Sequence, residues 1–213
     1  MIEGFTNIEG SKIVLDIITT IQNNKQYLSD IDGAIGDGDH GINMNKGFTM
    51  CERELAGSPG DLSYSLKVLS KVLIQDIGGS MGPLYGMFFR AMSDCCKDKE
   101  IIDAKLFAEM LKASEEGVKE IGVAEVGDKT MLDTLVPAVN AFCESTGNNK
   151  GFIESLEEMK QAAIKGKEST IDMIARVGRA SRLGERSRGF VDAGATSCCL
   201  ILEAMADTIK TIV

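Results

Sequence analysis

The sequence predicts an all-α fold, an antiparallel bundle of eight helices. Apolar residues recur at the three- and four-residue spacing of a buried helical face, as in Ile13, Ile17 and Ile21. The chain has only 3 prolines and 5% aromatic residues. No Asn-Gly or Asp-Gly turn separates two alternating runs, so strands have little support. Long helices with short connections are typical of a bundle.

Glycine or aspartate lies near most of the breaks between the expected helices. The isoleucine pattern predicts the first helix, and a leucine pattern from Leu62 to Leu73 predicts the third. Pro83 suits the first turn of a helix, whereas Pro137 lies inside a helical pattern and predicts a kink. The expected helices span residues 8–29, 42–56, 61–77, 83–97, 103–121, 129–146, 152–182 and 194–212.

Length and composition limit the class of protein. With 213 residues, 44% of them hydrophobic, the chain can bury a full core, and we expect residues 1–213 to form one domain. A net charge of −9 argues against a general nucleic-acid or anionic-membrane surface. The chain start has no basic and apolar leader pattern, and no apolar stretch reaches the roughly 18 residues of a membrane span. We therefore expect a cytoplasmic protein.

The six cysteines include two adjacent pairs, Cys95–Cys96 and Cys198–Cys199, and no C-x-x-C spacing. This pattern is typical of neither a zinc site nor a disulfide framework. We interpret all six as reduced thiols within helices.

Glycines concentrate in four of the expected connections, residues 31–41, 78–84, 122–131 and 179–197. These are the first, third, fifth and seventh connections. Because alternate connections of an antiparallel bundle lie at the same end, the four segments are expected to converge there and to form the functional site.

The segment 31–41 reads "IDGAIGDGDHG" and contains three aspartates and the only histidine. Its G-x-G-x-x-G spacing follows a helix rather than a strand, so a dinucleotide fingerprint is not supported, and the EF-hand and Walker A patterns also fail. Three adjacent carboxylates repel one another unless a cation compensates them. Few hard oxygen ligands with open positions suit Mg²⁺ completed by phosphates, although a solvated acidic turn is the simpler alternative.

The other three segments carry groups that suit a phosphorylated ligand. The glycines around Ser80 allow backbone N–H groups to approach phosphate oxygens at a helix start. Met131 could flank a base, although methionine in a helix is more often a core residue. Four arginines fall within ten residues of an acidic chain and could close over phosphates or form a solvated basic face; they are Arg179, Arg182, Arg186 and Arg188.

Four stretches resemble, in the same order, those of the nucleotide-binding L subunit of dihydroxyacetone kinase: "AIGDGDHGINMNKGF", "GGSMGPLYG", "GDKTMLDTLVPA" and "GRASRLGERS" with the later "GATS". The resemblance extends over nearly the whole chain. It implies an eight-helix antiparallel barrel with ADP or ATP at one end, held through two Mg²⁺ ions. It also implies phosphoryl transfer from the nucleotide to dihydroxyacetone.

The resemblance further implies roles for individual residues. The metal ligands would be Asp32, Asp37 and Asp39, which keep the family spacing D-x4-D-x-D. Arg179 would be the catalytic residue that stabilises the moving phosphoryl group. The nucleotide contacts would fall at His40, Gly41, Asn43, Ser80, Gly82, Gly122, Met131, Arg179, Asp192 and Gly194.

The chain departs from the family pattern near its last connection. Asp192-Ala193-Gly194 stands where relatives usually carry Asp-Pro-Gly, so the segment before it is expected to be more mobile. Arg182 replaces a common tyrosine, and a common His-Gln pair is absent. These changes leave the acceptor open, and a paralogue acting on another short ketose or triose is one alternative.

The single histidine bears on the partners that the resemblance implies. The family holds its ketone on a histidine of a separate K subunit, and His40 is expected at the nucleotide, so this chain should need a K subunit. Its freestanding length resembles the phosphotransferase-system type, in which a phospho-histidine donor (M) subunit rephosphorylates tightly bound ADP. A homodimer is a further partner hypothesis, and neither nucleic acid nor membrane is expected. The alternative from another class is a non-catalytic, nucleotide-dependent regulator of a transcription factor.

Overall fold

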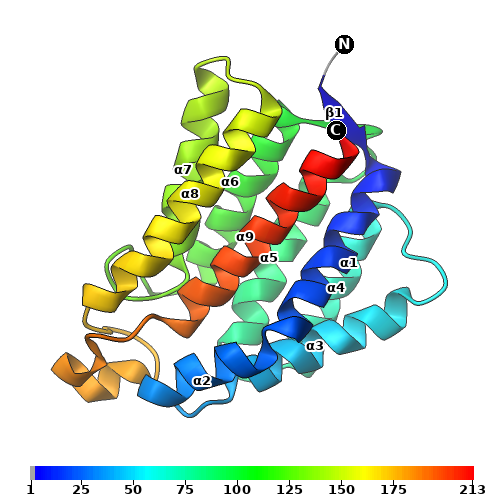
Figure 1. The fold of residues 1–213 in the computed structure, drawn as a ribbon. Coiled ribbons are helices and arrows are strands. Elements are labelled where there is room, and N and C mark those ends of the chain that lie inside the picture. Colours follow the sequence, from blue (N-terminus) through cyan, green and yellow to red (C-terminus); the bar gives the residue numbers. More distant parts are fainter. Residues whose placement is uncertain (1–2) are drawn as a thin grey trace.

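The computed structural model describes residues 3–213 and shows an antiparallel assembly of helices (Figure 1). The predicted all-α fold class is confirmed. Over these residues the chain forms nine α-helices and two three-residue strands. In chain order they are β1 Gly4–Thr6, α1 Asn7–Asn23, α2 Lys25–Ile35, α3 His40–Leu55, α4 Leu62–Asp76, α5 Met81–Cys96, β2 Ile101–Asp103, α6 Ala104–Ile121, α7 Leu132–Gly147, α8 Phe152–Ser169 and α9 Ala193–Ile212.

β1 and the C-terminus lie at the same end of the assembly (Figure 1). Backbone pairing and packed side chains close this end. β1 pairs antiparallel with β2, a short sheet that the sequence did not predict because three residues are too few for a recognisable alternation. The buried Asn7 side chain donates to the carbonyls of Cys96 and Lys99, at 2.8 Å each. Aromatic rings with centroids 5.3 to 6.3 Å apart fill this end; they belong to Phe5, Phe107, Phe142 and Phe152.

The predicted first helix, residues 8–29, is in fact two helices. α1 ends at Asn23 and α2 begins at Lys25, with Asn24 at φ −102° and ψ 9° between them. The Asn24 side-chain amide donates to the Thr20 carbonyl at 2.8 Å. Such a local bond competes with the helical backbone pattern and accounts for the break. α2 extends six residues beyond the predicted end, to Ile35, and therefore carries Asp32.

The predicted helix 152–182 ends early, at Ser169. The 3₁₀ helices η1 (Thr170–Asp172) and η2 (Ala180–Ser187) follow it. Gly178, with φ 69°, lies between them in the left-handed region. We call residues 170–192 the arginine segment; it lacks the apolar stripe that would hold a helix on the core.

Four connections lie at the end opposite β1, which we call the site end. They are the α2–α3 turn, the α4–α5 connection, the α6–α7 connection and the arginine segment (Figure 1). α7 begins at Leu132 rather than at the predicted residue 129, because Lys129 has a φ of 64° and cannot continue a helix. The site end thus consists of turns, whereas the opposite end consists of packed aromatic rings.

Two expectations from composition are also met. All six cysteines are free, and each lies within a helix. Over residues 3–213, no helix has both the length and the apolar content needed to cross a membrane.

Candidate functional site

A cavity of about 760 Å³ opens at the site end, and residues from all four connections line it. The convergence predicted from the glycine-rich segments is therefore confirmed. The cavity brings together most of the residues singled out in the sequence. Those that line it are Asp32, Asp37, Asp39, His40, Asn43, Ser80, Gly122, Met131, Arg179, Asp192 and Gly194.

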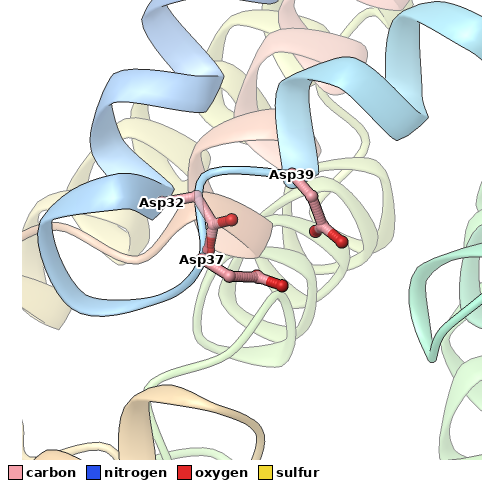
Figure 2. Close-up of side chains that lie close together, drawn as sticks. All are labelled: Asp32, Asp37 and Asp39. Atoms are coloured by element: carbon pink, nitrogen blue, oxygen red, sulfur yellow. The ribbon is translucent and has the colours of Figure 1, made fainter.

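The three aspartates form one cluster, which we call the aspartate cluster. Asp32 lies in the last turn of α2, Asp37 in the α2–α3 turn, and Asp39 at the start of α3. One carboxylate oxygen from each lies within 4.8 Å of the others. Figure 2 shows the three side chains on one side of the turn. A turn of four residues between two helices therefore produces a compact group of hard oxygen ligands.

Asp39 occupies the N-cap position of α3, but its side chain accepts no capping hydrogen bond. At the N-caps of α4, α6 and α9, by contrast, the aspartate accepts from a backbone N–H at 2.7 to 2.8 Å. Burial and the neighbouring Asp37 raise the pKa of Asp39 above its ordinary value, and Arg179 opposes this shift. The Asp39 carboxylate therefore lines the cavity and does not cap the backbone of α3.

Arg179 is the arginine that reaches the cluster. Its guanidinium forms an ion pair with the Asp37 carboxylate, and it alone of the four predicted arginines lines the cavity. Arg188 instead pairs with Glu185 at 3.5 Å within the arginine segment. Both partners of the Arg179–Asp37 pair are more than one third exposed, so the pair itself adds little stability.

His40 belongs to a small hydrogen-bonded network beside the cluster. Its Nε2 lies 2.8 Å from the Ser197 hydroxyl, and that hydroxyl lies 2.7 Å from the Tyr85 hydroxyl. Its backbone N–H donates to the Asp32 carboxylate at 3.2 Å. Burial lowers the pKa of His40 to about 4, so the imidazole is neutral near pH 7. The network joins α3, α5 and α9, and it fixes the position of the ring.

Tyr85 and Ser197 were not singled out from the sequence. The Tyr85 hydroxyl also donates to the Gly194 carbonyl at 3.0 Å, which places α5 against the start of α9. Both residues lie inside stretches that carry the family resemblance, "GGSMGPLYG" and "GATS", so the signal was present without a role attached. Burial raises the pKa of the Tyr85 hydroxyl well above its ordinary value.

Two predicted phosphate contacts, Gly41 and Gly82, do not line the cavity. A Cβ at Gly41 would lie 2.1 Å from the Lys25 carbonyl oxygen, and one at Gly82 would lie 2.2 Å from the Ile77 carbonyl oxygen. Both glycines therefore allow a helix start to pack on the preceding backbone, a requirement that is independent of any ligand. Their contact with a nucleotide remains a prediction.

The α6–α7 connection is organised by Asp133, which is 1% exposed. Its carboxylate accepts from the N–H of Gly127 at 2.5 Å and of Thr130 at 2.7 Å. Between these donors, Lys129 directs its ammonium to the backbone of the arginine segment. Neither Asp133 nor Lys129 was identified from the sequence, although both lie in "GDKTMLD".

Apolar side chains line the cavity together with these polar groups. They come from α5, from the end of α6, from the α6–α7 connection and from the start of α7. Met131, one of them, is only 4% exposed and also belongs to the core. A cavity with an apolar lining and several convergent charged groups suits a ligand with a flat apolar part and an anionic part. The apolar group comprises Leu84, Val118, Ile121, Val123, Ala124, Met131 and Leu132.

Comparison with known proteins decides the family. The DAK2 domain pattern matches residues 34–207, which include Asp37 and Asp39 of the aspartate cluster and the whole arginine segment. The chain belongs to the DAK2 domain family. The matched region of this DAK2 domain begins near the end of α2, two residues after Asp32, and ends within α9.

Other DAK2 domain proteins show how the chain compares in sequence. It is 40% identical over 189 residues to the Listeria innocua protein named PEP-dependent dihydroxyacetone kinase 1, ADP-binding subunit DhaL, with 88% of this chain and 89% of that protein covered. It is 38% identical over 192 residues to the Escherichia coli protein named PEP-dependent dihydroxyacetone kinase, ADP-binding subunit DhaL, with 90% of each chain covered.

A solved structure supports the fold. The dihydroxyacetone kinase of C. freundii, crystallised in complex with AMP-PNP and Mg²⁺, matches with a TM-score of 0.68 and 24% identity. The match covers 92% of this chain and 33% of that kinase chain. The region that resembles this DAK2 domain is therefore about a third of the C. freundii kinase chain.

Proposed function

We propose that this chain is the nucleotide-binding subunit of a dihydroxyacetone kinase and works as one domain over residues 1–213. Its reaction is the transfer of a phosphoryl group from Mg-bound ATP to dihydroxyacetone held on a separate K subunit. One observation carries the proposal. Three carboxylates within 4.8 Å and one guanidinium face a cavity of about 760 Å³ that also has an apolar lining. The relatives named as ADP-binding subunits cover about nine tenths of the chain.

The donor set fits magnesium. Asp32, Asp37 and Asp39 present oxygen ligands and no nitrogen or sulfur, which suits a hard cation. Asp32 lies at the C-terminal end of α2, where the helix dipole disfavours a carboxylate, so a cation there would remove an unfavourable charge. In the proposal these side chains hold two Mg²⁺ ions. Such ions, when bound, would neutralise charge on the nucleotide phosphates.

The residues of the chain supply binding and orientation. The apolar wall from Leu84 to Leu132 would hold the base, and the start of α5 at Ser80 would receive phosphate oxygens at a helix N-terminus. His40, neutral and fixed by Ser197, would present its other ring nitrogen to the nucleotide without adding charge. Arg179 would stabilise the negative charge that develops on the transferred group. No covalent step on this chain is required.

The structure supports the need for partners. His40 is the only histidine, and its ring lies at the proposed nucleotide cavity with Nε2 bonded to Ser197, so we do not assign it to a ketone. We therefore assign the ketone to a K subunit. We further propose that bound ADP is rephosphorylated in place by a phospho-histidine donor (M) subunit, since four connections around one ligand predict slow dissociation.

A labelled-nucleotide experiment tests the function. The protein is loaded with labelled ADP and Mg²⁺ and mixed with excess unlabelled ATP and a K subunit, with and without the donor subunit. We expect slow label release, and multiple turnovers of ketone phosphorylation only when the donor is present. Rapid release with ATP-supported turnover would show an ordinary ATP-using kinase. Nucleotide binding without transfer to dihydroxyacetone or to another short ketose would instead identify a regulator.

A further inference from the structure

Lys129 is the most unusual charged residue of the structure. Its side chain is 2% exposed although it carries an ammonium group. The Nζ atom donates to four backbone carbonyls, those of Thr170 at 2.7 Å, Met173 at 3.3 Å, Ser187 at 2.8 Å and Phe190 at 2.5 Å. Because an ammonium has three N–H groups, at least one N–H is shared between two of the four carbonyls. The carbonyl oxygens thus form a cage around the charge.

The backbone of Lys129 is also unusual. Its φ of 64° is uncommon for a residue other than glycine and costs on the order of 1 kcal/mol or more. The Asp133 carboxylate maintains this turn by accepting from Gly127 and Thr130, on either side of Lys129. Surrounding bonds therefore hold the lysine in a conformation that directs its side chain beneath the arginine segment.

The four carbonyls occupy particular places in the arginine segment. Two of them, at Thr170 and Met173, precede the stretch that carries Arg179, and two, at Ser187 and Phe190, follow it. One ammonium therefore joins the two sides of the loop at its base. Two further bonds close the same base: the Gly189 N–H donates to the Ile171 carbonyl at 2.8 Å, and the Ala175 N–H donates to the Ser187 hydroxyl at 2.9 Å.

We propose that Lys129 is a positioning residue that fixes the base of the arginine segment and thereby places the Arg179 guanidinium against the aspartate cluster. The ammonium is committed to the four carbonyls and is not available to a phosphate. The effect on catalysis rests on the proposed function of Arg179, whereas the effect on the segment does not. The two parts are therefore tested separately.

The first test is hydrogen exchange of the nucleotide-free protein. Lys129→Ala removes the ammonium, and Lys160→Ala is the matched control, since Lys160 is also a poorly exposed lysine but pairs with Asp207 on α9. We expect the amides of residues 170–192 to exchange roughly 10- to 100-fold faster in Lys129→Ala, because four carbonyls at the base of the segment lose their donor. The other helices and the Lys160→Ala protein should exchange as the wild type does.

Chemical rescue separates the ammonium from general packing. Propylammonium matches the atoms that Lys129→Ala deletes, from Cγ to Nζ, and it should restore slow exchange of the arginine segment. Tetramethylammonium has the same charge but no N–H donor and should not. Unchanged exchange in Lys129→Ala, or equal effects of the two cations, would overturn the proposal. Loss of protection throughout all helices would also overturn it, since the lysine would then act on global stability.

A double-mutant cycle tests the link to Arg179. Turnover is measured with K and donor subunits for Lys129→Ala, Arg179→Ala and the double variant. If Lys129 acts through Arg179, the double variant should turn over about as slowly as Arg179→Ala alone. If the double variant shows the product of the two single losses in turnover, the link is refuted. A wild-type protein without turnover would refute the proposed function, and the exchange experiment would still judge whether Lys129 anchors the segment.

Discussion

The Lys129 ammonium and the aspartate cluster both lie at the site end, but they differ in the partners that compensate their charge. The Lys129 ammonium is buried and has four carbonyl acceptors. The aspartate cluster contains three carboxylates within 4.8 Å of one another, and the positive charge paired with it is Arg179. Among residues 3–213, the N-cap aspartates of α4, α6 and α9 accept capping bonds, whereas Asp39 does not.

The difference separates a structural charge from a charge kept for a ligand. A buried charge whose hydrogen bonds are complete organises the backbone around it, and its removal should damage the structure. Carboxylates that repel one another contribute little to folding, and their removal should affect binding while leaving the nucleotide-free protein folded. Each prediction below tests one side of this comparison.

The largest effect is expected for Asp37→Asn. Affinity for Mg-ADP should fall roughly 1,000-fold, because the variant removes a charged ligand at the centre of the site. The free energy of unfolding of the nucleotide-free protein should change by less than about 1 kcal/mol, since the lost pair with Arg179 is exposed and the repulsion of Asp39 is relieved.

Calorimetric titration and urea unfolding measure these two quantities. Asp30→Asn is the control, because Asp30 is an exposed aspartate of α2 that bonds to Gln26 outside the cluster. Equal affinities of the two variants would contradict the metal assignment. A large loss of stability in Asp37→Asn would show that the cluster is structural.

Arg179 lies between the two charged groups, on a segment anchored by Lys129 and in contact with Asp37. Arg179→Ala should lower turnover about 100-fold and affect nucleotide affinity much less, if the guanidinium acts on charge that develops during transfer. Arg179→Lys should rescue poorly because it lacks the planar donor pair. Steady-state kinetics beside Mg-ADP titrations decide this. Equal losses of turnover and of nucleotide affinity would indicate a simple phosphate contact.

Asp192 lies on the Lys129 side and should make stability depend on pH. Burial raises its pKa to about 6, opposed by the Ala195 N–H and by Lys129. Because the folded state then binds the proton more tightly than the unfolded state, the free energy of unfolding should fall as pH rises from about 4 to 6.

Asp192→Asn keeps an N-cap acceptor but cannot ionise. Relative to the wild type, it should gain on the order of 2 kcal/mol between pH 4 and pH 7. Urea unfolding of both proteins across this range measures the difference, in which the contributions of other titrating groups cancel. Parallel pH profiles would show that Asp192 titrates normally in the folded state.

Much of the fold could be predicted because its information is local. The spacing of isoleucine and leucine gives the helices, and glycines mark the connections. The errors have different causes, a competing side chain in one helix and the loss of the apolar stripe in another. Asn24 breaks the first helix through its amide, and the helix predicted to reach residue 182 ends at Ser169. β1 starts at Gly4 and β2 starts 97 residues later, at Ile101. Their pairing therefore depends on tertiary packing.

The candidate site divides in the same way. The aspartate cluster could be predicted because its three members lie within eight residues of one another. The cage around Lys129 could not, since its acceptors are backbone carbonyls 41 to 61 residues away, and carbonyls leave no mark in a sequence. Gly41 and Gly82 show the converse. The pattern predicted them as nucleotide contacts, which stays a prediction, whereas the structure shows that each lies against preceding backbone, at Lys25 and at Ile77.

The smallest effect is expected at Ala193, where the family resemblance of the sequence predicts a proline. Ala193 is the first residue of α9, a position that tolerates proline because its N–H has no helical partner. Asp192, with φ −79° and ψ 136°, already has the extended conformation that precedes proline. Ala193→Pro should therefore raise the free energy of unfolding by about 0.4 to 1 kcal/mol, mainly by restricting the unfolded chain.

The same substitution tests how far the base of the arginine segment is already fixed. If Lys129 holds this base, Ala193→Pro should slow the dissociation of labelled ADP by less than about threefold, since its stabilisation arises mainly from restricting the unfolded chain and changes the folded site little. Urea unfolding and label release measure the two effects, with Ala193→Gly as the opposite control. A large slowing of release would show that the segment is mobile at its Ala193 end. A destabilised Ala193→Pro protein would show that α9 begins differently from the structure.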